Sequence, residues 1–201
     1  MNDRRNVRME VELERQVKDY IHNDIANAAH HLKKTIETRM AADDRDGIFL
    51  DMMAALTMIA FAVEANLNFI GARVVEGWVE KQSGKDKWTQ VLGTLGIEAD
   101  YSQRPFSTLE QLRQFRDTLA HGKPRVLDEK ETAIGTYDEL YSANEVKARA
   151  PWEPYVTLES VQVGYDDMNA IWNLMLKEAG IELHDTLSGW NGGMTYKRDV
   201  D

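Results

Sequence analysis

The sequence predicts an all-α protein, a single-domain bundle of four to five main helices. Apolar residues recur at steps of three and four over long stretches, as amphipathic helices require. All four prolines lie beyond residue 100, so nothing interrupts long helices in the first half of the chain. A chain of 201 residues is long enough to bury one sizeable core.

The first half of the chain predicts two long helices and a short one. In the first, the apolar positions from Met9 to Ile36 fit a helical period, so we expect no strand there. A turn at 43–47 separates it from a second helix over 49–76. This second helix is apolar nearly all round, which predicts a place in the middle of the bundle. After another turn at 83–86, a short helix runs from Trp88 to Leu95.

The second half predicts two further helices separated by a long loop. Ser107 and Glu110 have the spacing of a capping box, and Gly122 and Pro124 have that of a helix stop. A long, irregular, acidic loop over 125–155 follows, with a short helix at about 137–146. The last helix expected is 158–179. We expect residues 1–182 to form one helical domain, and 183–201 to form a polar, glycine-containing tail that is extended or docked on a partner.

Composition limits the classes of function. The chain has no cysteine and a formal net charge of −10. Without cysteine, thiol chemistry and zinc–cysteine sites are excluded, and a reducing cytoplasm is expected. The negative charge disfavours a broad nucleic-acid-binding surface. No signal peptide is visible, and the longest uncharged apolar run is too short for a bilayer, so we expect no membrane association. The residues from Gln103 to Arg125 nevertheless carry a charge of +3, which predicts a local site for a phosphate-bearing ligand.

The strongest chemical motif lies at the end of the 107–121 helix. Arg116 and His121 are separated by four residues, and Asp117 follows the arginine directly. A guanidinium holds phosphate through several N–H donors, and a histidine transfers protons near neutral pH. These two groups are sufficient to cleave an RNA backbone without a metal ion if they meet at one phosphate.

This segment resembles the R-x4-6-H motif of the HEPN domain family, in the variant that has Asn, Asp or His after the arginine. A second similarity lies upstream, where Glu64 and Asn68 are one turn apart in an apolar helix, as is common in HEPN-like proteins before the motif helix. The resemblance covers residues 48–125. It implies a HEPN-like bundle in which Glu64 and Asn68 support the site.

A regular helix aims Arg116 and His121 in nearly opposite directions, since each residue adds about 100°. Either the helix unwinds at His121, as Gly122 permits, or a second subunit supplies the partner group. HEPN proteins commonly dimerise so that two motifs face one cleft. We therefore expect a homodimer whose interface includes the motif helix.

Glu64 allows two interpretations. A carboxylate in so apolar a helix is costly unless it is paired, so we expect it to be buried and bonded to a backbone amide or to Arg116. It would then be purely structural, or it would orient the site from behind. The sequence does not separate these interpretations.

By resemblance, the expected activity is metal-independent endonucleolytic cleavage of RNA, in a toxin or a phage-defence protein. His121 would act as acid or base and Arg116 would stabilise the phosphoryl group, with Asp117 orienting His121. Flanking phosphates would be bound by Arg113, Lys123 and Arg125. We expect no cofactor and no metal site; possible partners are RNA or a nucleotide, and an antitoxin or defence protein.

Two alternatives remain open. In the first, a catalytically inactive HEPN-like module binds a nucleotide or a protein or mediates dimerisation, and His121 only caps its helix. In the second, the chain is an unrelated helical bundle in which the motif occurs by chance.

Overall fold

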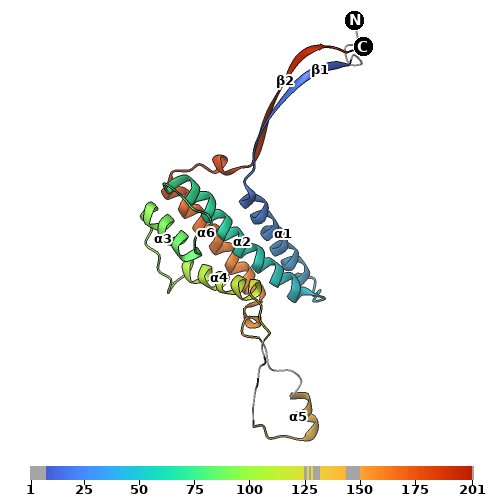
Figure 1. Cartoon of the computed structure of the whole chain (residues 1–201). Helices are drawn as coiled ribbons and strands as arrows, with labels where there is room; N and C mark the ends of the chain where they lie inside the picture. Colours follow the sequence, from blue (N-terminus) through green and yellow to red (C-terminus); the bar gives the residue numbers. More distant parts are fainter. Residues whose placement is uncertain (1–7, 125, 127, 129–131, 144–149, 201) are drawn as a thin grey trace.

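The computed structural model describes residues 8–124, 126, 128, 132–143 and 150–200. It is mostly helical, with a two-stranded sheet that projects from one end of a helical bundle (Figure 1). The long helices are α1 (Ile21–Ala41), α2 (Ile48–Val74), α3 (Gly84–Leu95), α4 (Phe106–Ala120) and α6 (Leu158–Ala179). The shorter ones are α5 (Tyr137–Ala143), η2 (Glu153–Tyr155) and η3 (Leu183–Thr186). The expectation of a helical bundle with four to five main helices is thus confirmed in its helical character, but the fold is not purely α.

The central helix is α2, as its all-round apolar sequence predicts. It packs against α1, α3, α4 and α6, and residues such as Leu56, Ile59 and Ile70 are fully buried. By length and composition alone, α2 also meets the criteria for a membrane-spanning helix, with a mean hydropathy of 1.9 over its most apolar window.

Close packing around α2 requires glycine at one position. A Cβ atom on Gly71 would lie 2.5 Å from ring carbons of Trp78. The indole therefore covers the last turns of α2 directly, which fixes the path of the chain between α2 and α3.

Local sequence signals explain both ends of α3 and of α6. Ser83 and Thr157 accept hydrogen bonds from backbone N–H groups at the starts of α3 and α6, and Gly96 and Gly180 end these helices in left-handed conformations. The capping box expected at Ser107 is wrong. Helix α4 begins at Phe106 after Pro105 and has no side-chain cap, and Glu110 binds Arg113 instead of returning to the helix start.

The expectation of one helix from Met9 to Ile36 is wrong for its first half. Residues Met9–Lys18 form strand β1, which pairs antiparallel with β2 (Gly189–Asp199). The predicted tail over 183–201 begins with η3 and is extended only after it, and its strand pairs with the other end of the chain. We call this two-stranded element the ribbon.

The error has a clear cause. Met9, Leu13 and Val17 lie four residues apart, a spacing that one face of a helix and one face of a strand both satisfy. Val11 distinguishes the strand from the helix, because with Val11 the apolar residues occupy every second position over 9–13, as in a strand. The polar residues between them, Glu10, Glu12 and Glu14, complete the alternation.

A compact junction joins the ribbon to the bundle. Tyr20 N–H donates to Ser188 Oγ over 2.9 Å, and Asn23 Nδ2 donates to the Thr186 carbonyl over 2.8 Å. The guanidinium of Arg73 lies 4.4 Å from the centre of the Phe69 ring and donates to the Asp185 carbonyl. These contacts fix the root of the ribbon beside the end of α2.

An ion pair between the exposed Arg104 and the buried Asp167 ties the segment before α4 to α6. Arg104 Nε and Nη2 donate to the two carboxylate oxygens of Asp167 over 2.8 and 2.9 Å. Burial alone would raise the pKa of Asp167, but hydrogen bonds from Arg104 and Thr108 hold that pKa below its usual value.

This pair predicts how acid affects the stability of the fold. An Asp with a lowered pKa in the folded state stabilises the protein above its unfolded pKa of about 3.9, and this contribution is lost as the pH falls through the folded value. The melting temperature of the parent should therefore fall more steeply below about pH 4 than that of Asp167→Asn. Equal slopes in thermal melts between pH 7 and pH 2.5 would contradict this role.

Candidate functional site

Charged side chains along α4 form a connected network. Arg113 Nη2 contacts Glu110 Oε1 over 2.6 Å, and Arg113 Nη1 contacts Asp117 Oδ2 over 3.0 Å. Asp117 Oδ1 in turn lies 3.1 Å from Arg116 Nη1. The spacings of three and four residues place these groups on one face of the helix. The arginine holds the pKa of Glu110 below its usual value, and the pKa of Arg113 is raised, so both remain charged.

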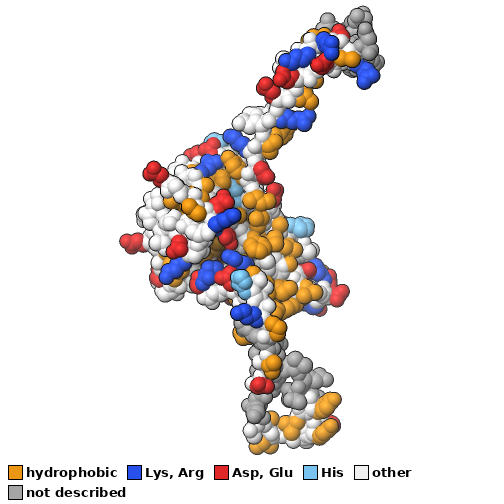
Figure 2. Space-filling model, in the orientation of Figure 1, with side chains coloured by type: hydrophobic (Ala, Val, Ile, Leu, Met, Phe, Trp, Pro, Cys, Tyr) orange, Lys and Arg blue, Asp and Glu red, His pale blue; other side chains and the backbone are white. Residues whose placement is uncertain are grey.

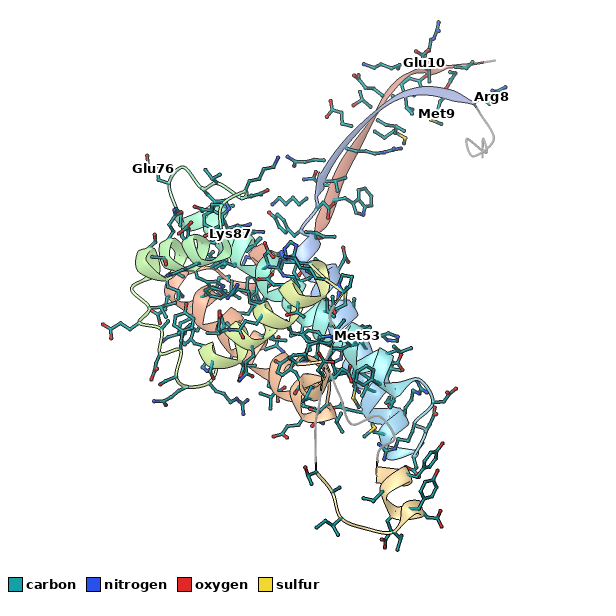
Figure 3. All side chains as sticks on the ribbon, turned by 60° about the horizontal axis from the view of Figure 1, so that its bottom comes forward. Arg8, Met9, Glu10, Met53, Glu76 and Lys87 are labelled. Atoms are coloured by element: carbon teal, nitrogen blue, oxygen red, sulfur yellow. The ribbon has the colours of Figure 1, made fainter. Side chains whose placement is uncertain are left out.

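The network continues from α4 into α2 and α3 through Glu64. Arg116 Nη2 donates to Glu64 Oε2 over 2.9 Å, and Lys87 Nζ donates to Glu64 Oε1 over 3.2 Å. Lys87 lies on α3 where this helix faces α2 (Figure 3), and its side chain is only 4% exposed. Three cations and three carboxylates therefore form one chain of contacts, with Arg116 bound between two carboxylates.

The expectation for Glu64 is confirmed in one part and wrong in another. It is hydrogen-bonded to Arg116, as predicted, but its side chain is 37% exposed and so is not buried. Lys87 is the buried partner. The sequence signal for Lys87 is its spacing of four residues from the buried Val91, which places its stem on the inner face of α3.

His121 lies just beyond the network. Helix α4 ends at Ala120, and His121 leaves the helical conformation with φ −110° and ψ 28° while its backbone N–H still donates to the Asp117 carbonyl. Its side chain is exposed. Within the described part of the chain, the Asp117 carboxylate pairs with Arg113 and Arg116 and not with His121. The helix does end at His121, one of the two possibilities that the angular mismatch allows.

The other predicted site residues lie at different distances from the network. Asn68 is one turn from Glu64 on α2, and its Oδ1 is buried without a hydrogen-bond partner among the described residues. Lys123 is exposed beyond the end of α4. Arg125 lies outside the described residues. The structure thus joins Arg113, Arg116, Asp117 and Glu64, and adds Lys87 and Glu110 to them.

An open hollow lies beside the Arg113 end of the network. It has a volume of about 570 Å³. Three aromatic side chains, Trp88, Tyr101 and Phe106, line it together with Lys85, Arg113 and Glu110. Aromatic faces and cations together are suited to a nucleotide base and its phosphate.

Metal-ligating side chains do not cluster in the part of the chain that the structure describes: no three His, Asp or Glu residues there are close enough to hold an ion.

Comparison of the chain with protein-family models, curated proteins and solved structures finds no match. The similarity to HEPN domains rests on the motif residues and the spacing of Glu64 and Asn68.

Proposed function

We propose that this protein is a metal-independent endoribonuclease of HEPN type. The observation that carries the proposal is the placement of Arg116. It is held by Glu64 from α2 and by Asp117 from its own helix, while the exposed His121 ends that helix. An arginine fixed from two sides is preorganised, and preorganised donors stabilise developing charge most effectively.

The reaction needs only groups that this chain supplies. The 2′-hydroxyl of the RNA loses its proton to a base and attacks the adjacent phosphorus atom. The bond from phosphorus to the 5′-oxygen breaks, and an acid protonates that oxygen. The products are a 2′,3′-cyclic phosphate and a 5′-hydroxyl. Arg116 stabilises the charge on the non-bridging oxygens, and His121 transfers protons.

One histidine cannot serve as base and acid at the same moment. A homodimer that places two motif helices across one cleft supplies two copies of His121, one for each proton transfer. It also overcomes the angular mismatch between Arg116 and His121 within one helix. The hollow beside Trp88 and Arg113 would bind the flanking nucleotide.

A second function is supported by a specific observation. The six charges of the network balance one another, and the whole chain is acidic, so the surface around Arg116 attracts RNA only weakly. Weak attraction for RNA is sufficient for a HEPN-like module that binds a nucleotide or a partner protein and cleaves no RNA.

Cleavage assays on purified protein separate the two functions. Mixed cellular RNA, a tRNA and a single-stranded oligomer should be incubated with the protein in EDTA, and the product ends analysed. The ribonuclease predicts cleavage that persists in EDTA and leaves 2′,3′-cyclic phosphate ends. Folded protein that cleaves none of these RNAs, with or without added divalent cations, would favour the binding module.

A further inference from the structure

The ribbon has one apolar face and one polar face. Cross-strand pairing places Leu13 opposite Met194 and Val17 opposite Trp190, so their side chains share one face. We call this the apolar ribbon face, and it comprises Val11, Leu13, Val17, Trp190, Met194 and Tyr196. On the opposite face, Glu10 pairs with Arg198 over 2.6 Å.

The apolar ribbon face is exposed to solvent in the single chain. Trp190 is 77% exposed and Val17 is 68% exposed. The ribbon extends away from the bundle (Figure 1), and Figure 2 shows apolar side chains along it. A two-stranded ribbon is at best marginally stable in water when no other element packs on it. Its apolar face therefore needs a covering surface.

A matching surface lies on α2. Leu50 and Phe61 are exposed large apolar side chains, and they belong to a row of exposed or half-buried uncharged residues along this helix. We call this row the α2 stripe: Leu50, Ala54, Thr57, Phe61, Ala65 and Ala72. A hollow of about 520 Å³ follows its second half. It is also lined by Ile21 and Ile25 of α1, and charged residues stand around it: Asp19, Glu64, Arg73 and Glu80. Figure 2 shows apolar side chains continuing from the ribbon over this part of the bundle.

The two surfaces agree in length and in shape. Ten residues of a strand span about 33 Å, and Ala72 lies about 33 Å along the helix from Leu50. The ribbon carries large side chains such as Trp190 and Tyr196, whereas the α2 stripe alternates large residues with alanine. The α2 stripe itself carries no charged residue. The apolar ribbon face carries Arg15, opposite Gly192 and between Leu13 and Val17, and the carboxylates of Asp19, Glu64 and Glu80 around the hollow are available to its guanidinium.

We propose that the ribbon is an arm that binds a second copy of this chain, with its apolar face along the α2 stripe of that copy. The ribbon leaves the bundle beside the end of α2, near Ala72. Two copies related by a two-fold axis at their ribbon roots would each lay the arm along the other copy's α2, from Ala72 toward Leu50. This arrangement is reciprocal and closed.

The area involved is sufficient for a stable dimer. The apolar ribbon face is about 33 Å long and about 10 Å wide. Two reciprocal arms, with the helix surfaces beneath them, would bury roughly 1,300 Å², within the range of about 1,200–2,000 Å² for specific interfaces. This contact does not use the motif helix and does not rest on the proposed ribonuclease function.

The first test measures the mass of the full chain by light scattering. Trp190→Glu places a charge in the apolar contact and should raise the dissociation constant on the order of 100-fold, halving the observed mass. Leu50→Glu should do the same from the other side. The observed mass should be halved if the parent is a dimer. It should also be halved if a second contact through the motif helix makes the parent a tetramer. Two matched controls should keep the parent's mass: Asn191→Glu, the neighbouring residue on the polar ribbon face, and Asn173→Glu, an exposed position on α6.

The second test traps the contact directly. Because the chain has no cysteine, one introduced thiol per copy reports a single contact. Leu13 is about 13 Å from Val17 along the strand. When Val17 lies beside Ala72, Leu13 therefore lies between Ala65 and Phe61, which are about 10 and 16 Å from Ala72 along α2. An equimolar mixture of Leu13→Cys and Phe61→Cys chains should form a disulfide between the two variants on mild oxidation, and a mixture of Glu12→Cys and Phe61→Cys should not.

Several results would overturn the proposal. These are a monomeric parent at about 50 µM, an unchanged mass in both Trp190→Glu and Leu50→Glu, or Leu13→Cys chains that link only to one another. A monomer whose ribbon binds lipid vesicles instead would also contradict it. RNA cleavage has no bearing on these measurements, so the arm and the ribonuclease can fail separately.

Discussion

Replacing His121 with alanine should lower the rate of RNA cleavage by at least about 10²–10⁴-fold, the usual contribution of general acid–base catalysis. The fold should be unaffected, because the His121 side chain is exposed and only its backbone N–H takes part in ending α4. Initial rates on the best RNA substrate and circular dichroism melts of both proteins provide the measurement.

His31→Ala is the matched control, since it removes another exposed histidine, on α1. It should cleave RNA at the parent's rate. If His121→Ala cleaves as fast as the parent, the activity does not arise from this motif. Arg116→Ala should also abolish cleavage, but its melting temperature must be measured alongside because it releases Glu64 from its ion pair.

Replacing Glu64 with alanine should destabilise the protein by on the order of 3 kcal/mol, since an almost fully buried ammonium group loses its counter-ion. Lys87 is the group concerned: Glu64 is its only ion-pair partner within the described residues, and its side chain is 4% exposed. Urea denaturation of the parent and of Glu64→Ala measures the change.

A second substitution distinguishes this cause from others. Lys87→Met keeps an apolar stem of similar length and removes the charge, so Glu64→Ala combined with Lys87→Met should recover most of the lost stability. If the double variant is no more stable than Glu64→Ala, the loss arises from the contact with Arg116. An unchanged stability in Glu64→Ala alone would show that the Lys87 ammonium reaches water.

The bundle was predictable where periodicity and caps agree. Helix α6 has the expected bounds because Thr157 and Gly180 mark its ends, and α2 differs from its predicted range by only one or two residues. The strand β1 was missed because residues spaced by four do not distinguish a helix from a strand. The pairing of β1 with β2 could not be predicted from the sequence either, because no local signal connects segments at opposite ends of a chain.

The candidate site was predictable to a similar degree. The pair of Glu64 and Arg116 follows from the cost of a lone carboxylate in an apolar helix, and the structure contains it. The link to Lys87 was missed because a lysine on an amphipathic helix normally points to solvent. The engagement of Asp117 by two arginines depends on side-chain rotamers, which a sequence does not specify.

The ribbon also determines the order in which the chain can fold. Tyr20 and Ser188, which bond at its root, are 168 residues apart in sequence, so pairing the strands first would require closing nearly the whole chain into a loop, at a large entropic cost. Helices α1, α2 and α6 bring these two residues together when they pack. Strand pairing therefore follows assembly of the bundle, and the largely exposed ribbon can open while the core of the bundle stays packed.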